Sequence, residues 1–179
     1  MARSAPPSTR RRGGGSGRGA SRTESQRFVA DAMLGSLARK LRVFGFDTVY
    51  FRDGPDSELE RVARVERRIL LTSDRGLFAD AEARGLTAFL VQGRSERARL
   101  QSMVERARGV SVRLTPGETR CALCNGELVP VRKSDVAGRV PEAVRRRHRA
   151  FYACEGCDKV YWKGRHWSRL RRLDSVLLR

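Results

Sequence analysis

The chain has 179 residues, of which 40% are hydrophobic and 32% charged, and its 38 Lys and Arg side chains outnumber its 20 Asp and Glu side chains to give a net charge of +18. This length fits one modest domain with additional segments. No stretch approaches the ~18 consecutive apolar residues that a membrane span requires, so we exclude a transmembrane protein. The basic N-terminus leads into glycine and serine rather than an apolar run. No secretory or twin-arginine signal is readable, and we expect a cytoplasmic protein.

The positive charge is concentrated at both ends of the chain. Residues 1–27 carry 7 basic and 1 acidic side chain, residues 28–118 carry 16 and 13, and residues 119–179 carry 15 and 6. Basic segments attract polyanions because each neutralised phosphate releases a condensed counterion, which favours nucleic acid as a partner. Another explanation stays open, because 34 of the 38 basic residues are arginine and GC-rich codon usage produces that bias without selection for binding.

The N-terminal segment, residues 1–27, has no periodic apolar positions and consists mainly of Arg, Gly, Ser, Pro and Ala. We therefore expect a disordered basic tail. Its segment Gly15–Ala20 formally matches a dinucleotide-binding glycine pattern. We discard the match because no predicted strand precedes it and no helical pattern follows it.

Residues 28–118 alternate apolar runs with helical patterns. The predicted strands are residues 27–31, 48–51, 69–73 and 87–91, and residues 110–114 are a candidate fifth strand. The first predicted helix runs from Leu34 to a C-cap at Gly45, and the second begins at Ser57 with Glu60 in a capping box. A short third helix ends near Gly85, and a fourth covers about residues 95–108. This alternation indicates βαβ units. We therefore expect an α/β domain with a parallel sheet flanked by helices.

Four carboxylates follow the predicted strands: Asp31 closes the first, Asp53 and Asp56 follow the second, and Asp74 closes the third. In open α/β sheets, sites form outside the carboxyl ends of the strands, so these side chains should gather at one edge. Asp47 precedes its strand, and we expect it at the opposite edge as a turn or cap residue. Crowded carboxylates repel one another unless a cation neutralises them, and Mg²⁺ or Mn²⁺ prefers carboxylate and water ligands. Phosphodiester hydrolysis uses such ions and needs no protein nucleophile.

Structural roles compete with catalysis at two of these positions. Asp56 is able to cap the helix that begins beside it, and Asp53 is able to initiate the turn at Gly54-Pro55. Asp31 and Asp74 directly follow apolar strands, where a carboxylate is partly shielded from water, and this favours a functional role. The candidate catalytic set therefore contains all four aspartates, with Asp31 and Asp74 as the expected ligands of Mg²⁺ or Mn²⁺.

The only cysteines of the chain are Cys121, Cys124, Cys154 and Cys157, which form two CxxC pairs with 29 residues between them. Each pair can bring two thiolates to one tetrahedral Zn²⁺. A disulfide framework is disfavoured by the absence of a readable signal peptide, and a redox dithiol needs only one pair. We expect a structural zinc site that folds a segment too short for a core of its own.

Residues 119–179 combine this predicted zinc ribbon with cations and aromatic rings. The side chains that we expect to bind nucleic acid are Arg145, Arg146, Arg147, Arg149, Lys163, Arg165 and Trp167. Such a mixture suits RNA, because unstacked bases stack on rings while arginines hold phosphates. Phe151, Tyr152 and Trp162 fit equally well as packing residues of the ribbon strands.

Several ungapped motifs occur in order along the chain, namely Phe28–Gly35, Leu37–Arg39, Gly45–Thr48, Ile69–Arg75, the four cysteines and Val160–Trp167. Together they resemble the Mut-7 C-terminal RNase domain, a PIN-like nuclease fold fused to a zinc ribbon, over about residues 27–172. The resemblance implies a metal-dependent RNase with Asp31 and Asp74 at the family's acidic positions and Asp53 or Asp56 as the third. Some relatives carry an N-terminal ubiquitin-like domain, and here the basic tail stands in its place.

The sequence thus predicts three parts: a tail (1–27), a PIN-like α/β nuclease domain (28–118) and a zinc ribbon with a basic C-terminal segment (119–179). The leading hypothesis is a metal-dependent ribonuclease whose partner is RNA, with DNA possible and no small-molecule cofactor. A non-catalytic RNA- or DNA-binding protein is the main alternative. A signalling phosphoacceptor is disfavoured because Leu90–Gly93 lacks the lysine that such a site uses after a late strand.

Overall fold

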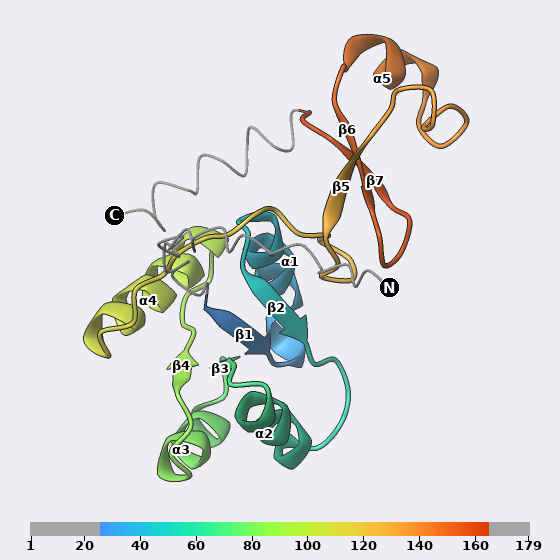
Figure 1. Cartoon of the computed structure of the whole chain (residues 1–179). Coiled ribbons are helices and arrows are strands. Elements are labelled where there is room, and N and C mark those ends of the chain that lie inside the picture. Colours follow the sequence, from blue (N-terminus) through green and yellow to red (C-terminus); the bar gives the residue numbers. More distant parts are fainter. Residues whose placement is uncertain (1–25, 165–179) are drawn as a thin grey trace, which may run out of the picture.

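The computed structural model describes residues 26–164 (Figure 1). The predicted tail therefore lies almost entirely outside the described residues. The same holds for two of the predicted nucleic-acid-binding residues, Arg165 and Trp167. No helix in the described range has the length and apolarity that crossing a bilayer requires.

The first part of the described chain forms a four-stranded parallel sheet with the order β2-β1-β3-β4. The strands are β1 (Arg27–Ala30), β2 (Asp47–Tyr50), β3 (Ile69–Thr72) and β4 (Ala88–Leu90). In the register of the two central pairings, Phe28 lies opposite Thr48 on one side and Ile69 on the other. The expected fold class, a parallel α/β sheet flanked by helices, is confirmed.

Helices cover both faces of this sheet (Figure 1). They are the 3₁₀-helix η1 (Ala32–Leu34), α1 (Gly35–Val43), α2 (Asp56–Val65), α3 (Arg75–Ala83) and α4 (Glu96–Gly109). Successive side chains of a strand point to opposite faces. Phe28 and Ala30 therefore pack in the core under α1 and α4, whereas Val29 packs in the core under α2 and α3. Burial on both faces explains why the strands are apolar runs rather than alternating patterns.

The helix boundaries differ from the prediction at α2. The predicted capping box at Ser57 is wrong, because the helix begins one residue earlier and Pro55 occupies the N-cap position without a side-chain hydrogen bond. Glu60, the expected partner of Ser57, is buried at 6% exposure and forms an ion pair with Arg84 after α3. Tertiary packing between α2 and α3 thus withdraws Glu60 from the helix terminus.

The optional fifth strand at residues 110–114 is also wrong. Val112 and Leu114 pack against the core under α1 and α4, but this segment joins neither sheet of the described residues. The chain continues to Gly117, whose N–H donates to the carbonyl of Gly45 at 3.1 Å. Gly45 follows the last turn of α1 with φ +92°, and a Cβ there would lie 2.1 Å from the Gly117 oxygen. The predicted glycine cap of α1 is confirmed, and this close approach adds a second reason for glycine.

The second part is a three-stranded antiparallel sheet, which we call the ribbon, with the order β5-β6-β7. Its elements are β5 (Leu128–Val131), α5 (Glu142–Arg147), β6 (Phe151–Cys154) and β7 (Val160–Trp162). Phe151 is 1% exposed at the centre of a small core with Val136, Val140 and Val160. The packing alternative is therefore the correct one for Phe151. Trp162 also packs against this core while staying partly exposed.

Candidate active site and metal centre

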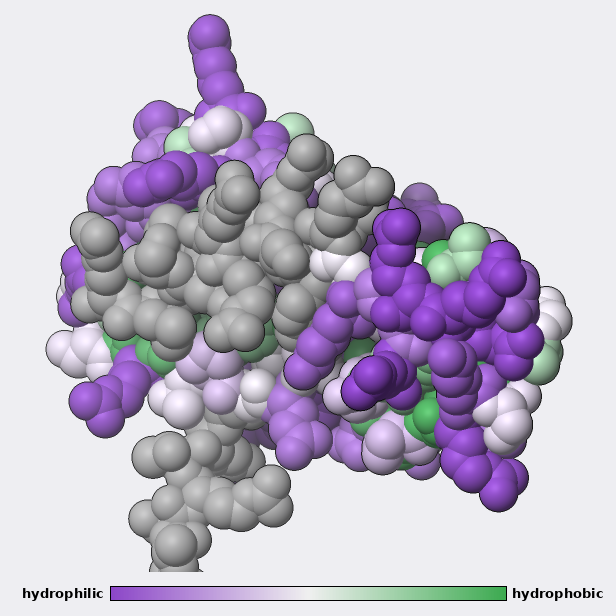
Figure 2. Space-filling view, turned by 90° about the horizontal axis from the view of Figure 1, so that it is seen from above, coloured by the Kyte–Doolittle hydropathy of each residue, from purple (hydrophilic) through white to green (hydrophobic). Residues whose placement is uncertain are grey.

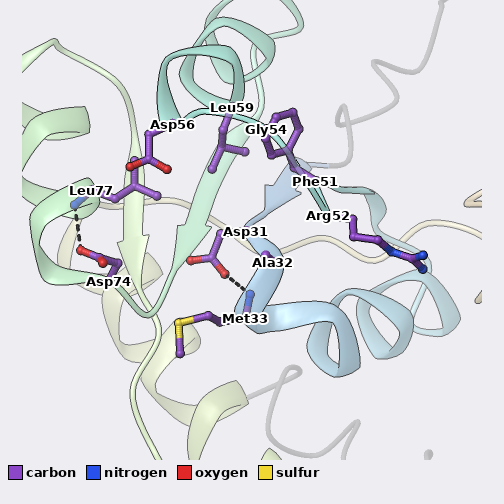
Figure 3. A pocket seen from close by; sticks show the side chains of 10 residues that line it. All are labelled: Asp31, Ala32, Met33, Phe51, Arg52, Gly54, Asp56, Leu59, Asp74 and Leu77. Carbon is purple, nitrogen blue, oxygen red and sulfur yellow. Dashed lines mark hydrogen bonds between the residues drawn. The ribbon is translucent and has the colours of Figure 1, made fainter.

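Three carboxylates line one pocket of about 170 Å³ at the carboxyl ends of the parallel strands (Figure 3). Asp31 directly follows β1, Asp56 is the first residue of α2, and Asp74 directly precedes α3. The three side chains come from separate segments of the chain, and the parallel strand order brings these segments to the same edge. Asp53 lies outside the set of residues that line the pocket.

Asp31 is the most firmly held of these carboxylates. Its Oδ1 accepts the N–H of Met33 at 2.9 Å, and its Oδ2 accepts the N–H of Ser73 at 3.2 Å and the hydroxyl of Thr72. Asp31 is only 7% exposed. A buried carboxylate is costly unless hydrogen bonds compensate it, and here three donors fix both of its oxygens.

Thr72 connects Asp31 to Asp74 and was not among the residues singled out from the sequence. Its fully buried hydroxyl donates to Asp31 and accepts the N–H of Asp74 at 2.9 Å. The available signal was a hydroxyl residue at the end of a fully apolar strand, two positions before an aspartate. A threonine there reads equally well as an ordinary β-branched strand residue, so sequence reasoning passed over it.

Asp74 caps helix α3. Its Oδ1 accepts the N–H groups of Gly76 at 2.6 Å and Leu77 at 3.0 Å, and the side chain is exposed to solvent. Figure 3 shows the bond to Leu77 at the rim of the pocket. A carboxylate at a helix N-terminus is stabilised by two unpaired amides and by the helix dipole. Capping uses Oδ1, so the structural role of Asp74 is compatible with a ligand role for Oδ2.

Asp56 occupies the same end of α2 without capping it. It is exposed, and the cap position of this helix belongs to Pro55. The preceding turn contains Gly54 with φ +130°, where a Cβ would lie 2.7 Å from the Phe51 ring. This turn leads the chain from β2 to α2 and places Asp56 in the lining of the same pocket as Asp31 and Asp74 (Figure 3).

The pocket concentrates negative charge. No ion pair within residues 26–164 involves Asp31, Asp56 or Asp74. Arg52 also lines the pocket, but its side chain points away from the carboxylates in Figure 3. The three carboxylates are too far apart for one oxygen of each to lie within 4.8 Å of both others. Oxygen ligands around a space for several waters fit Mg²⁺ or Mn²⁺, which retain water ligands.

Asp47 lies at the opposite edge of the sheet, as expected, and is the first residue of β2 rather than a residue before it. It is not a turn or cap residue: it forms an ion pair with Arg68 at 2.8 Å and accepts the Asn125 side-chain amide at 2.6 Å. Burial alone would raise the pKa of Asp47, but the hydrogen bonds from Arg68 and Asn125 outweigh it and lower the pKa. Asn125 belongs to the cysteine segment, so this edge of the sheet contacts the metal centre.

The four cysteines form a compact cluster whose sulfur atoms all lie within 4.8 Å of one another. Cys121 Sγ is 3.6 Å from Cys157 Sγ, and Cys124 Sγ is 3.3 Å from Cys154 Sγ. A tetrahedron with Zn–S bonds of about 2.3 Å has S–S edges of about 3.8 Å. The cluster is therefore arranged to hold a tetrahedral metal such as zinc, and within residues 26–164 no other group of three His, Cys, Asp or Glu residues is this close.

The two CxxC segments have the same backbone conformation. In the first knuckle, residues 121–126, the N–H of Asn125 donates to Cys121 O at 2.9 Å; in the second, residues 154–159, the N–H of Asp158 donates to Cys154 O at 3.0 Å. Asn125 and Asp158 both adopt left-handed backbone with φ 69° and 61°. Asn and Asp tolerate this conformation better than most residues. The spacing and the turn residue together build two equivalent metal-binding knuckles.

Close backbone packing surrounds the sulfur atoms. A Cβ at Gly126 would lie 2.9 Å from Cys154 Sγ and 3.3 Å from Cys124 Sγ, so only glycine fits. Burial raises the pKa of the Cys121 thiol, but hydrogen bonds from Tyr161 and from the backbone of Cys124 and Leu123 outweigh it and lower the pKa to about 6. A thiol with a lowered pKa supplies the thiolate that metals bind.

The predicted nucleic-acid-binding residues within the described range lie on the ribbon. Arg146 and Arg147 are exposed on α5, and Arg149 and Lys163 are exposed after α5 and β7. Arg145 is half-buried and forms an ion pair with Glu142. The predicted nucleic-acid-binding residues that the structure describes are therefore Arg145, Arg146, Arg147, Arg149 and Lys163. Seen from above, the ribbon side on the right of Figure 2 is predominantly hydrophilic. On this surface, Arg146, Arg147, Arg149 and Lys163 form no ion pair with another described residue.

Comparison with protein-family models gives a match to the Mut7-C RNAse domain over residues 26–174. Comparisons with curated proteins and with solved structures give no match. The family match spans the sheet, the acidic pocket and the cysteine cluster, and it indicates a nuclease function with a nucleic acid as substrate. The parallel sheet, the three converging aspartates and the two knuckles agree with the motifs that carry the resemblance in the sequence. The chain belongs to the Mut7-C RNAse domain family.

Proposed function

We propose that this protein is a metal-dependent ribonuclease that hydrolyses RNA phosphodiester bonds in the pocket of Asp31, Asp56 and Asp74. The observation that carries the proposal is the convergence of three carboxylates from three segments on one solvent-open pocket, with no ion pair to any of them within residues 26–164. Membership of an RNase-domain family supports the same reaction. Asp56 is preferred over Asp53 because it lines the pocket.

The chain's own groups divide the work in the pocket. Asp31, Asp56 and Asp74 would hold one divalent ion or a neighbouring pair, in part through water ligands, with Asp31 fixed by its three donors and Asp74 by its helix cap. When bound, Mg²⁺ or Mn²⁺ lowers the pKa of water and offsets negative charge on the phosphoryl oxygens. Water would add to phosphorus and give up a proton, the bond to the leaving oxygen would break, and that oxygen would take up a proton. The exposed Arg52 side chain points away from the carboxylates, and in this proposal it contacts a more distant phosphate of the substrate.

The ribbon and the basic tail serve in this proposal to hold the RNA, with zinc as the structural metal. The first knuckle contacts the edge where β2 begins, and the pocket lies at the edge where β1 and β3 end. The sheet separates these edges by about 13 Å, since four strand residues rise about 3.3 Å each. A substrate that contacts both the ribbon and the pocket must therefore extend along the side of residues 28–118. This length favours single-stranded RNA over a single nucleotide.

A cleavage assay tests the proposal. Purified protein is incubated with end-labelled single-stranded RNA, duplex RNA and DNA in the presence of Mg²⁺, Mn²⁺ or EDTA. We expect RNA products with either ion and none with EDTA. The double variant Asp31→Asn/Asp74→Asn should lose cleavage but bind RNA as well as or better than the wild type, because two negative charges beside the phosphates are removed. Asp80→Asn, on the exposed surface of α3, is the matched control and should cleave normally.

The same assay separates the main alternative, a non-catalytic RNA- or DNA-binding protein. That function predicts a mobility shift with steep salt dependence and no products with any divalent ion. Cleavage by the double variant at the wild-type rate would show that the reaction does not use this pocket.

A further inference from the structure

Arg42 is a buried arginine whose side chain joins the sheet to the first knuckle. It lies in the last turn of α1 and is only 5% exposed. Its Nε donates to Thr48 O at 2.8 Å, and its Nη1 donates to the carbonyls of Ala122 and Leu123 at 3.0 and 2.8 Å. Ala122 and Leu123 are the two residues between the first pair of cysteines. One guanidinium therefore fixes both the start of β2 and the loop that carries two metal ligands.

The backbone around Arg42 repeats this connection. The carbonyl of Arg42 accepts the N–H of Arg120 at 2.8 Å, and the hydroxyl of Thr119 donates to Val43 O at 3.0 Å. On the other side of the knuckle, the Asn125 side chain accepts the N–H of Thr48 at 3.0 Å. Thr48 lies on the edge strand β2, so Asn125 occupies a hydrogen-bonding position that a fifth strand would otherwise fill.

Charge gives Arg42 a second reason to face the knuckle. A buried guanidinium is costly unless a negative group compensates it, and no ion pair within residues 26–164 pairs Arg42 with a carboxylate. Four thiolates and the Zn²⁺ that they bind carry a combined charge of −2. Carbonyls bonded to Arg42 lie between two of those thiolates, so the metal-loaded cluster supplies the missing negative charge.

We propose that Arg42 and Asn125 couple metal binding at the four cysteines to the stability of the parallel sheet. Metal fixes the first knuckle, and the fixed knuckle holds Arg42, Asn125 and the start of β2 in place. Because coupling between two equilibria is reciprocal, removing metal loosens the sheet and loosening the knuckle contacts weakens metal binding. The stability of residues 28–118 thus depends on the first knuckle and not on the second. This inference rests on metal at the cysteines and is independent of the proposed ribonuclease activity.

The equivalence of the two knuckles supplies a matched pair of variants. Asn125→Gly and Asp158→Gly each replace the left-handed residue after the second cysteine by glycine, which keeps that conformation without strain. Asn125 contacts Thr48 and Asp47 of the sheet, whereas Asp158 contacts Arg139 within the ribbon. A chelator competition on the full-length zinc-loaded protein measures the affinity of each variant. We expect Asn125→Gly to lose affinity by roughly 10-fold or more relative to Asp158→Gly.

Arg42→Met should lower zinc affinity by roughly 10- to 100-fold, and Arg42→Lys should lose less because it keeps the charge. Arg39→Met, on the exposed side of α1, should leave the affinity unchanged. Hydrogen exchange of the wild type with and without zinc is the second readout, and it stands even if Arg42→Met fails to fold. Chelation should sharply reduce the protection of the Thr48 amide. Equal affinities of the two glycine variants, or a Thr48 amide indifferent to zinc, would overturn the coupling.

Discussion

The hydroxyl of Thr72 donates to Asp31 Oδ2 and accepts the N–H of Asp74, so one buried side chain joins two carboxylate residues of the pocket. Thr72 ends β3 beside β1, and the parallel pairing of these strands brings it against Asp31. Thr72 itself does not line the pocket. We therefore regard it as a positioning residue that orients Asp31 and the start of α3.

Thr72→Val removes this hydroxyl while keeping the shape of the side chain. The variant leaves a buried acceptor on Asp31 without its donor, and we expect a loss of about 1–3 kcal/mol in the free energy of unfolding. We expect the decrease in kcat to be larger than the increase in KM, because the orientation of Asp31 matters for the reaction. Thr72→Ser retains the hydroxyl and should recover most of the activity. A serine variant as impaired as the valine variant would point to packing instead of the hydrogen bond.

Asp56 and Asp53 lie three residues apart, both exposed, but only Asp56 lines the pocket. We expect Asp56→Asn to reduce cleavage by at least roughly 100-fold, the scale of losing one electrostatic group of an active site. Asp53→Asn should stay within a few-fold of the wild type. Metal-dependent rates of the two variants, measured over a range of Mg²⁺ concentrations, provide the comparison. The reverse order of activities would transfer the third ligand position to Asp53.

Arg146 and Arg147 are exposed on α5 and test whether the ribbon holds RNA. The double variant Arg146→Gln/Arg147→Gln should weaken RNA binding similarly for all sequences. It should also reduce the slope of log K against log salt by about 1.4, since each single-strand phosphate contact contributes about 0.7. Arg64→Gln/Arg67→Gln removes the same charge from two exposed positions, one in the last turn of α2 and one just after the helix, and serves as control. An equal loss in the two double variants would indicate that net charge, not the ribbon, determines affinity.

Asp47 and Arg68 form an ion pair with side chains that are 18% and 7% exposed. Because the pKa of Asp47 is lowered in the folded state, its contribution to stability is present above the unfolded carboxyl pKa of about 3.9. That contribution is lost as the pH falls through the lowered folded value. Asp47→Asn should therefore cost roughly 3 kcal/mol at neutral pH and show a smaller further loss below about pH 4 than the wild type.

Urea unfolding of Asp47→Asn and wild type at a series of pH values measures this difference. Asp135→Asn, which breaks an exposed pair with Arg132, is the control and should change stability little at any pH. Parallel pH curves for Asp47→Asn and the wild type would contradict the role of Asp47.

The sequence by itself determined the local features of this protein. Apolar runs alternating with helical patterns predicted four parallel strands, and the aspartates after Ala30 and Ser73 were placed at strand ends. The CxxC spacing predicted the four-sulfur cluster, because a two-residue gap is a local geometric property. These predictions succeeded because each rests on a pattern within one strand, one helix or one CxxC pair.

Only the tertiary structure decided which distant residues meet. The turn at Gly54 places Asp56 rather than Asp53 in the lining of the pocket, and packing against α3 draws Glu60 away from the predicted capping box. The hydroxyl of Thr72 and the guanidinium of Arg42 gained their partners across 41 and up to 81 positions of sequence. Period and spacing describe one strand or helix at a time, whereas such contacts depend on strand order and on how the knuckle docks against the sheet.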